Sequence, residues 1–155
     1  MTTNRRLPPG LAARPFFTVA EAVELGVSRR TLARLPRPHR GVLGHHLPTT
    51  VLEDAQALSL VLPPGCSYSH LTAAWLLGLP VPWRWSARER PHLDVACYGR
   101  TPPRRERVDG HRLNRPDLPT VMLPELSVPV LDAPHVFRQL HARAGAERPR
   151  RRRAR

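Results

Sequence analysis

Between residues 17 and 35, polar capping positions and hydrophobic positions follow one another at helical spacing (FTVAEAVELGVSRRTLARL). Thr18 and Glu21 have the spacing of a capping box, in which each residue satisfies a free backbone N–H group of the first helical turn. The helix that this box opens would bury three apolar positions at i, i+3 and i+4 spacing: Val19, Ala22 and Val23.

The first helix is predicted to end at Leu25, because Gly26 suits the left-handed conformation that often follows a helix. Ser28 would begin a second helix as its N-cap, with its hydroxyl accepting from a backbone N–H group of the first turn. Leu32 and Leu35 would pack the second helix against the first. Two short helices joined by about three residues that include a glycine form a helix-turn-helix.

The outer face of the second helix carries basic side chains. At about 100° per residue, Arg30 and Arg34 point away from the leucine face, and Arg29 lies on its flank. Arginine reaches guanine edges and phosphates from a helix in the major groove. The predicted DNA-binding residues are Ser28, Arg29, Arg30, Thr31, Arg34, Arg37 and Arg40.

The segment after Pro36 predicts a wing. A short strand through Val42 and Leu43 would lie beside the second helix and bring His39 and Arg40 near the same DNA backbone. The alternative is an amphipathic helical hairpin whose arginines are only solvated. Motif and charge together favour DNA binding.

The middle of the chain predicts both helices and strands. Thr50 and Glu53 repeat the capping-box spacing and open a helix, and a second helix within residues 66–80 is apolar on nearly every face. Alternation over residues 92–98 predicts a half-buried strand, and residues 111–115 would be the return strand of a hairpin.

Shorter apolar runs complete the pattern. Residues 121–123 and 128–131 suit edge strands, and a helix beginning near Asp132 would have Val136, Phe137 and Leu140 on its apolar side. The predicted fold class is therefore α+β. The predicted divisions are a flexible basic arm (1–15), a winged helix-turn-helix (16–47), a small α+β module (48–141) and a disordered arginine-rich tail (142–155).

The net charge of the chain predicts a polyanionic partner. The 155 residues carry a formal net charge of +13, with an isoelectric point of about 11.7. Such a balance favours nucleic acid. All 25 basic residues are arginine. Because a GC-rich coding sequence explains that bias, the choice of arginine over lysine is not functional evidence.

Cys66 and Cys97 stand 31 positions apart without a neighbouring motif, which indicates neither a disulfide framework nor a zinc site. We therefore expect both to be reduced and buried. No segment is apolar and long enough for a signal peptide or a membrane span. The sequence thus predicts a cytoplasmic protein without a membrane partner.

No group of residues has the spacing of a catalytic or metal site. Adjacent His45 and His46 would point to different faces of a strand, with no cysteine or carboxylate nearby. Ser69 and His70 lack a base and an oxyanion site, so a helix cap is favoured over catalysis. The carboxylates are scattered, at Asp94, Asp109, Asp117, Glu125 and Asp132. We expect no enzyme activity, no metal and no cofactor.

Three blocks of the sequence resemble one family: FTVAEAVELGVSRRTLARL, then RGVL, then YSHLTAAWLLGLP. They are similar to actinobacterial proteins whose N-terminal part is the AbiEi-type antitoxin winged helix. Residues 69–79 match the family's Ser-His-x-Thr-Ala-Ala-x-Leu-x-Gly-Leu block, whereas Leu43 stands where the wing usually has an aromatic residue. The resemblance covers about residues 16–141 and implies double-stranded DNA and a nucleotidyltransferase-like toxin as partners.

Many relatives carry a further C-terminal domain similar to very-short-patch repair endonucleases. Here an arginine run stands where that domain would follow, so the resemblance implies a protein truncated before any nuclease-like domain. The preferred hypothesis is an antitoxin-like transcriptional regulator of a type IV (AbiE-like) toxin–antitoxin system. A remnant or subunit of a very-short-patch-repair-like endonuclease, and an RNA- or ribosome-associated basic protein, stay open as alternatives.

Overall fold

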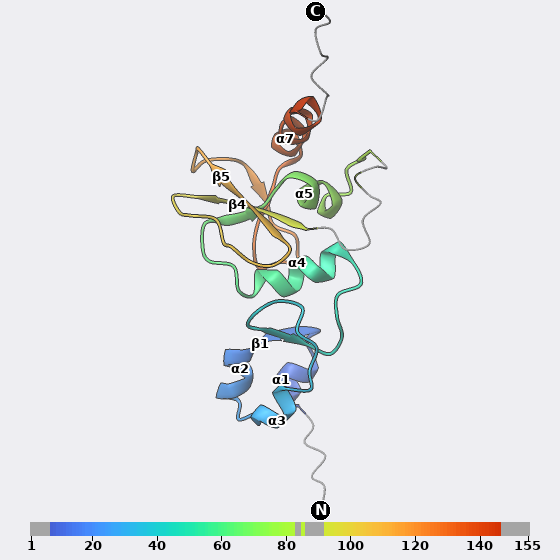
Figure 1. The fold of residues 1–155 in the computed structure, drawn as a ribbon, viewed down its shortest axis with the longest axis vertical. Coiled ribbons are helices and arrows are strands. Elements are labelled where there is room, and N and C mark those ends of the chain that lie inside the picture. The colour runs from blue at the N-terminus through green and yellow to red at the C-terminus, as the bar shows by residue number, and fades with distance from the viewer. Residues whose placement is uncertain (1–6, 83–84, 86–91, 147–155) are drawn as a thin grey trace, which may run out of the picture.

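A computed structural model describes residues 7–82, 85 and 92–146. Within them it contains six helices, a two-stranded sheet and a five-stranded mixed sheet, which confirms the α+β class. Residues 7–47, here called the N-terminal module, lie at one end of the molecule, and the described residues from 48 to 146, here called the sheet module, lie at the other (Figure 1). The predictions for residues 1–6 and 147–155 lie outside the described residues. Residues 142–146 of the predicted disordered tail belong instead to the last helix, so the prediction is wrong for them.

The N-terminal module surrounds a small core of its own. In chain order it contains α1 (Pro9–Ala12), β1 (Phe16–Thr18), α2 (Val19–Glu24), α3 (Arg29–Leu32) and β2 (Val42–Gly44). The strand β1 pairs antiparallel with β2, so that Phe17 lies opposite Leu43. The buried members of the core are Leu11, Phe17, Ala22, Leu32 and Leu43.

Local capping interactions set the two central helices, as predicted. The Thr18 hydroxyl accepts from the backbone N–H of Glu21 at 3.1 Å, and the Glu21 carboxylate accepts from the backbone N–H of Thr18 at 2.8 Å. Gly26 follows α2 with φ at +75°, which glycine adopts without the steric cost that a Cβ brings. Ser28 caps α3 by accepting from the backbone N–H of Thr31 at 3.3 Å.

Two details of this helix pair differ from the prediction. Val23 is 56% exposed, because α2 is short and only its Ala22 side is fully buried against the core. The helix α3 ends at Leu32, and residues 33–35 continue as a turn with i→i+3 hydrogen bonds. Pro36 prevents the helix from resuming after this turn, because a proline has no N–H group and disfavours the helical conformation of the residue before it.

Part of the predicted flexible arm belongs to the folded module. Leu11 of α1 is fully buried in the core, and its carbonyl oxygen lies 3.2 Å from Nε2 of His45. A buried leucine fixes the segment around it, so the expectation of a loose arm is wrong for residues 9–12.

Replacing Leu32 with alanine is expected to lower the free energy of unfolding by about 2–3 kcal/mol, because the substitution leaves a cavity in a small core. The value lies toward the lower end for such changes, since α3 is a single turn that can shift into the space. Denaturant unfolding of full-length protein measures the loss. Val23→Ala on the exposed side of α2 is the control and should change stability by less than about 0.5 kcal/mol. A larger loss for Val23→Ala would mean that the helix pair has its other face inward.

The sheet module places one mixed sheet between helices. Its elements are α4 (Val51–Ser59), β3 (Cys66–Tyr68), α5 (His70–Leu76), β4 (Leu93–Tyr98), β5 (Val108–Leu113), β6 (Thr120–Val121), β7 (Val130–Leu131) and α7 (Ala133–Ala146). The strand order is β5-β4-β3-β7-β6. In Figure 1, α4 lies on one side of the sheet and α5 and α7 on the other. The Tyr68 hydroxyl, which donates to the carbonyl of Ala55 at 2.6 Å, ties the sheet to α4.

The strand β4 was predicted, but its surroundings were not. The strand β5 runs parallel to β4, with Ala96 opposite His111, so the predicted hairpin is wrong. The chain instead returns through residues 99–107 before β5 begins. Residues 93–97 of β4 are all buried, not half-buried, because helices cover both faces of the sheet.

The cysteines also differ from the prediction. Cys66 of β3 lies directly opposite Cys97 of β4, with the two Cα atoms 4.3 Å apart. The two residues form a disulfide, so the expectation of reduced cysteines is wrong. The sequence spacing carried no sign of the bond, because the antiparallel register of β3 and β4 brings the two positions together.

The last helix, α7, has a buried side formed by Val136 and Leu140, as predicted. Phe137 is 65% exposed, so its predicted place on the apolar side is wrong. Neighbouring positions on a helix point about 100° apart, and Val136 takes the inward direction. Within the described residues, no helix combines the length and hydrophobicity needed to cross a membrane.

Candidate nucleic-acid interface

The basic surface of the N-terminal module lies on α3 and the turn after it. Arg29 and Arg30 of α3 are exposed, and so is Arg34, which follows the C-cap residue Ala33. Leu32 is 5% exposed and packs into the core. The arginine side chains are therefore held outward by a helix that is anchored on its opposite side.

The two predicted hydroxyl contacts serve the helix cap. Ser28 Oγ lies 3.0 Å from Thr31 Oγ1, in addition to accepting from the backbone N–H of Thr31. Both residues are half-buried. Ser28 and Thr31 therefore fix the start of α3, and their contact with DNA stays a prediction.

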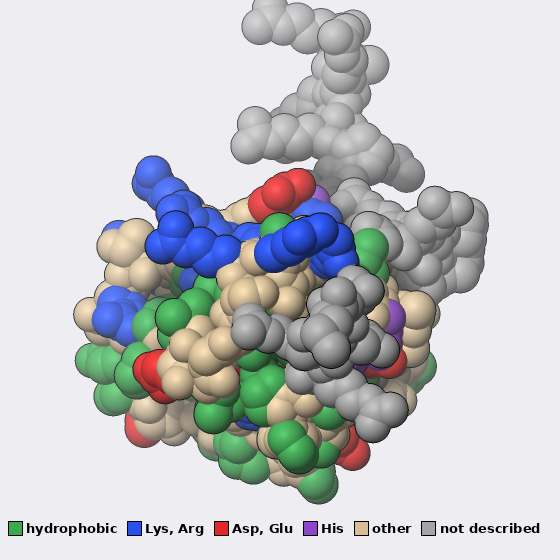
Figure 2. All heavy atoms as spheres, turned by 90° about the horizontal axis from the view of Figure 1, so that it is seen from below, with side chains coloured by type: hydrophobic (Ala, Val, Ile, Leu, Met, Phe, Trp, Pro, Cys, Tyr) green, Lys and Arg blue, Asp and Glu red, His purple; other side chains and the backbone are tan. Residues whose placement is uncertain are grey.

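The remaining two predicted residues, Arg37 and Arg40, line a groove between the N-terminal module and the sheet module. The other wall of this groove is the loop between β4 and β5. Its arginines are Arg37, Arg40, Arg104, Arg105 and Arg107, and Glu106 is the acidic residue of its lining. From below, basic side chains gather along one side of the surface while acidic side chains are scattered (Figure 2). We call these five arginines and their surroundings the cationic groove.

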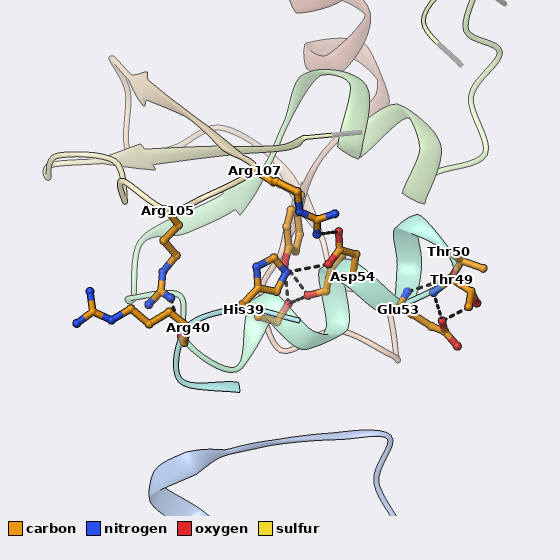
Figure 3. A network of polar contacts seen from close by, with 11 residues as sticks. His39, Arg40, Thr49, Thr50, Glu53, Asp54, Arg105 and Arg107 are labelled. Carbon is orange, nitrogen blue, oxygen red and sulfur yellow. Dashed lines mark hydrogen bonds and ion pairs between the residues drawn. The ribbon is translucent and has the colours of Figure 1, made fainter. Parts of the chain in front are cut away.

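Hydrogen bonds hold the two walls of the cationic groove together. The Arg105 guanidinium donates to the carbonyl of Arg40 at 2.9 Å (Figure 3). It also donates to the carbonyl of Val61 at 3.2 Å. Arg37, Arg40 and Arg104 are exposed, whereas Arg105 is half-buried. Arg105 thus stabilises the groove, and the exposed guanidinium groups are the ones that can contact an anion.

A buried ion-pair network lies behind the groove (Figure 3). Asp54 of α4 contacts His39 Nε2 through one carboxylate oxygen and the Arg107 guanidinium through the other, each at 2.8 Å. His39 is 6% exposed. The His39 ring is turned inward to Asp54, so its place near a DNA backbone stays a prediction.

A second cluster of polar residues lies on the other side of the sheet. Ligand atoms of His70, Asp94 and His111 all lie within 4.8 Å of one another, which is close enough for one metal ion. His111 Nε2 is 2.8 Å from Asp94 Oδ1, and the rings of His70 and His111 are stacked with their centroids 3.9 Å apart. Burial lowers the pKa of His70 to about 4, and the nearby charge of His111 acts in the same direction.

The cationic groove was partly visible in the sequence, whereas the cluster of His70, Asp94 and His111 was not. The basic run RTPPRRER at residues 100–107 was visible as a charged turn, but its place opposite Arg37 and Arg40 depends on how the two modules pack. His70, Asp94 and His111 are far apart in the chain and belong to three elements. No local motif joins them, so sequence reasoning had no means to find the cluster.

No protein-family profile matches the chain, and no curated protein is significantly similar to it.

Proposed function

We propose that the protein binds double-stranded DNA with α3 and the turn after it, in the manner of a winged helix-turn-helix. In this proposal α2 supports α3, and the largely buried β1–β2 pair packs behind the two helices, with Phe17 and Leu43 in their shared core. The observation that carries it is the exposure of Arg29, Arg30 and Arg34 on α3 and the turn after it, while Leu32 of the same helix is buried in the core. Arginines held by an anchored helix suit both base edges and phosphates.

The cationic groove supplies a second contact in the proposal. Its exposed side chains, Arg37, Arg40 and Arg104, come from two segments that Arg105 ties together. Contacts of arginine with phosphates position a protein on DNA without reading its sequence. We therefore assign sequence preference to α3 and backbone binding to the groove.

The resemblance to the AbiEi-type antitoxin family supports a narrower proposal, namely an antitoxin-like transcriptional regulator with a nucleotidyltransferase-like toxin as partner. The resemblance includes the helix-pair block FTVAEAVELGVSRRTLARL. In this block, the Thr18 and Ser28 hydroxyls accept from backbone N–H groups and cap α2 and α3. A regulator of this kind binds DNA near its own gene, so genomic fragments that flank the gene are the natural probes.

The proposal is tested by fluorescence anisotropy with full-length protein and two labelled duplexes of equal length, one DNA and one RNA. We expect tighter binding to DNA, because A-form RNA has a deep and narrow major groove that side chains cannot read. Equal or tighter binding to the RNA duplex would overturn the proposal and favour the RNA-associated alternative. Incubating plasmid DNA with protein and Mg²⁺ tests the endonuclease alternative, which cleavage would favour.

Removing residues 147–155 is expected to weaken binding to all DNA at low salt and to reduce its salt dependence. The deletion takes away six arginines and one glutamate, so the formal net charge falls from +13 to +8. Each phosphate that the segment neutralises adds about 0.9 to the slope of log affinity against log salt. The 1–146 protein and full-length protein are compared on two DNA sequences across a salt series. Lost discrimination between the sequences with an unchanged slope would contradict this division of roles.

A further inference from the structure

The cluster of His70, Asp94 and His111 has no part in the proposed DNA binding. These residues come from the start of α5, from β4 and from β5, on the side of the sheet that α5 and α7 cover. We propose that the cluster binds one divalent transition-metal ion, with Zn²⁺ as the best match, through two imidazole nitrogens and one carboxylate oxygen.

The parallel register of β4 and β5 brings two of the ligands together. Ala96 lies opposite His111, and Asp94 is two positions before Ala96, so Asp94 and His111 project from the same face of the sheet. Their side chains meet with 2.8 Å between Asp94 Oδ1 and His111 Nε2. The Asp94 backbone is itself fixed, because its N–H donates to Thr72 Oγ1 of α5 at 2.7 Å.

The third ligand, His70, is oriented by neighbours that leave one ring nitrogen for the cluster. Its Nδ1 lies 3.0 Å from Ser69 Oγ, so Nε2 is the remaining ring nitrogen. Metal-binding histidines are commonly oriented in this way, by a hydrogen bond at the other nitrogen. The backbone N–H of His70 donates to Gln139 Oε1 of α7 at 3.0 Å. The backbone φ of His70 is +48°, a value that residues other than glycine seldom adopt. Two helices therefore hold the ring over the sheet.

Coordination requires only side-chain rotation. Zinc binds nitrogen and oxygen at about 2.0–2.2 Å, which places tetrahedral ligand atoms about 3.4 Å apart. The three ligand atoms already lie within 4.8 Å of one another. The ring stack of His70 and His111 has to open so that both nitrogens point to one centre, and the ion then replaces the hydrogen bond between His111 and Asp94.

The donor set decides between metals. Two imidazoles with one carboxylate suit Zn²⁺ and similar transition metals, whereas Mg²⁺ and Ca²⁺ prefer oxygen ligands. Three protein ligands leave a position for water, and the His111 side chain is 31% exposed, which gives solvent access to the site. The Arg143 guanidinium lies 4.0 Å from Asp94 Oδ1 and opposes the cation by charge repulsion.

Isothermal titration of full-length, EDTA-treated and dialysed protein with ZnCl₂ tests the proposal. We expect one site per chain, with affinity reduced at least about tenfold in His70→Gln, Asp94→Asn and His111→Gln. His92→Gln is the matched control, because His92, directly before β4, contacts Asp109 of β5 at 3.0 Å in an exposed pair. A His45→Gln/His46→Gln double variant controls for binding at the adjacent histidines.

Two further readouts separate coordination from a structural role. Zn²⁺ should raise the thermal midpoint of the wild-type protein but not of His111→Gln, because a ligand that binds only the folded state stabilises it. Co²⁺ should give a visible absorption band that His70→Gln and His111→Gln both lose. Should Asp94→Asn fail to fold, the two histidine variants decide the outcome. Unchanged Zn²⁺ binding in both of them, or loss of binding in either control, would overturn the proposal.

Discussion

Replacing Asp54 with alanine is expected to lower the free energy of unfolding by about 3 kcal/mol. The side chain of Asp54 is 11% exposed and pairs with both His39 and Arg107, so its removal leaves two partners unsatisfied at once. Breaking a buried ion pair by removing one partner costs about 3–5 kcal/mol. The lower end applies here, because the Arg107 side chain is 25% exposed and regains some solvation.

Glu53→Gln is the matched control for Asp54, since it removes the same charge from the adjacent position of α4. The Glu53 carboxylate accepts from the backbone N–H of Thr49 at 2.7 Å and lies near the surface. A hydrogen bond contributes about 1 kcal/mol net, and glutamine keeps an acceptor oxygen at this position, so the expected loss is about 1 kcal/mol or less. Denaturant unfolding of the three proteins measures both changes. Equal losses for the two variants would mean that the buried Asp54 network contributes no more to stability than the exposed Glu53 contact.

The double substitution Arg30→Ala/Arg34→Ala is expected to weaken DNA binding at least about 30-fold. A bidentate contact between arginine and a base contributes about 1–3 kcal/mol, so the pair accounts for about 2 kcal/mol or more. Both side chains are exposed, so their removal opens no cavity. The thermal midpoint should therefore stay unchanged within experimental scatter, in contrast to Leu32→Ala.

The control for this variant removes two exposed arginines from the sheet module, Arg115 and Arg138. It changes the net charge equally, and Arg138 lies on α7, at the opposite end of the molecule from α3 (Figure 1). Anisotropy titrations at one salt concentration compare the two double variants with the wild-type protein. Equal losses of affinity would mean that net charge alone, and not α3, directs the binding.

The features that were predictable from the sequence are those encoded by neighbouring residues. The Thr18–Glu21 capping box, the turn at Gly26 and the cap at Ser28 each depend on groups within three positions, so spacing alone revealed them. The strand β4 was predictable for the same reason, because alternation along six residues marks a strand.

The features that escaped prediction depend on how distant elements pair. The parallel course of β5, the disulfide and the place of Arg104 beside Arg37 follow from sheet register and module packing. Buried polar groups were missed in the same way. In the sequence, His39 is a basic residue beside the predicted wing. Its buried partner, Asp54, lies fifteen positions later, and no local pattern connects the two.

The DNA-binding surface itself can be mapped by amide chemical shifts. Full-length, ¹⁵N-labelled protein is titrated with an unlabelled DNA duplex, and the shift of every assigned amide is followed. The account predicts that the largest shifts fall on residues 28–34, with a second group in the cationic groove at residues 37–40 and 104–107. Shifts concentrated on β6 and α7, with residues 28–34 unaffected, would contradict it.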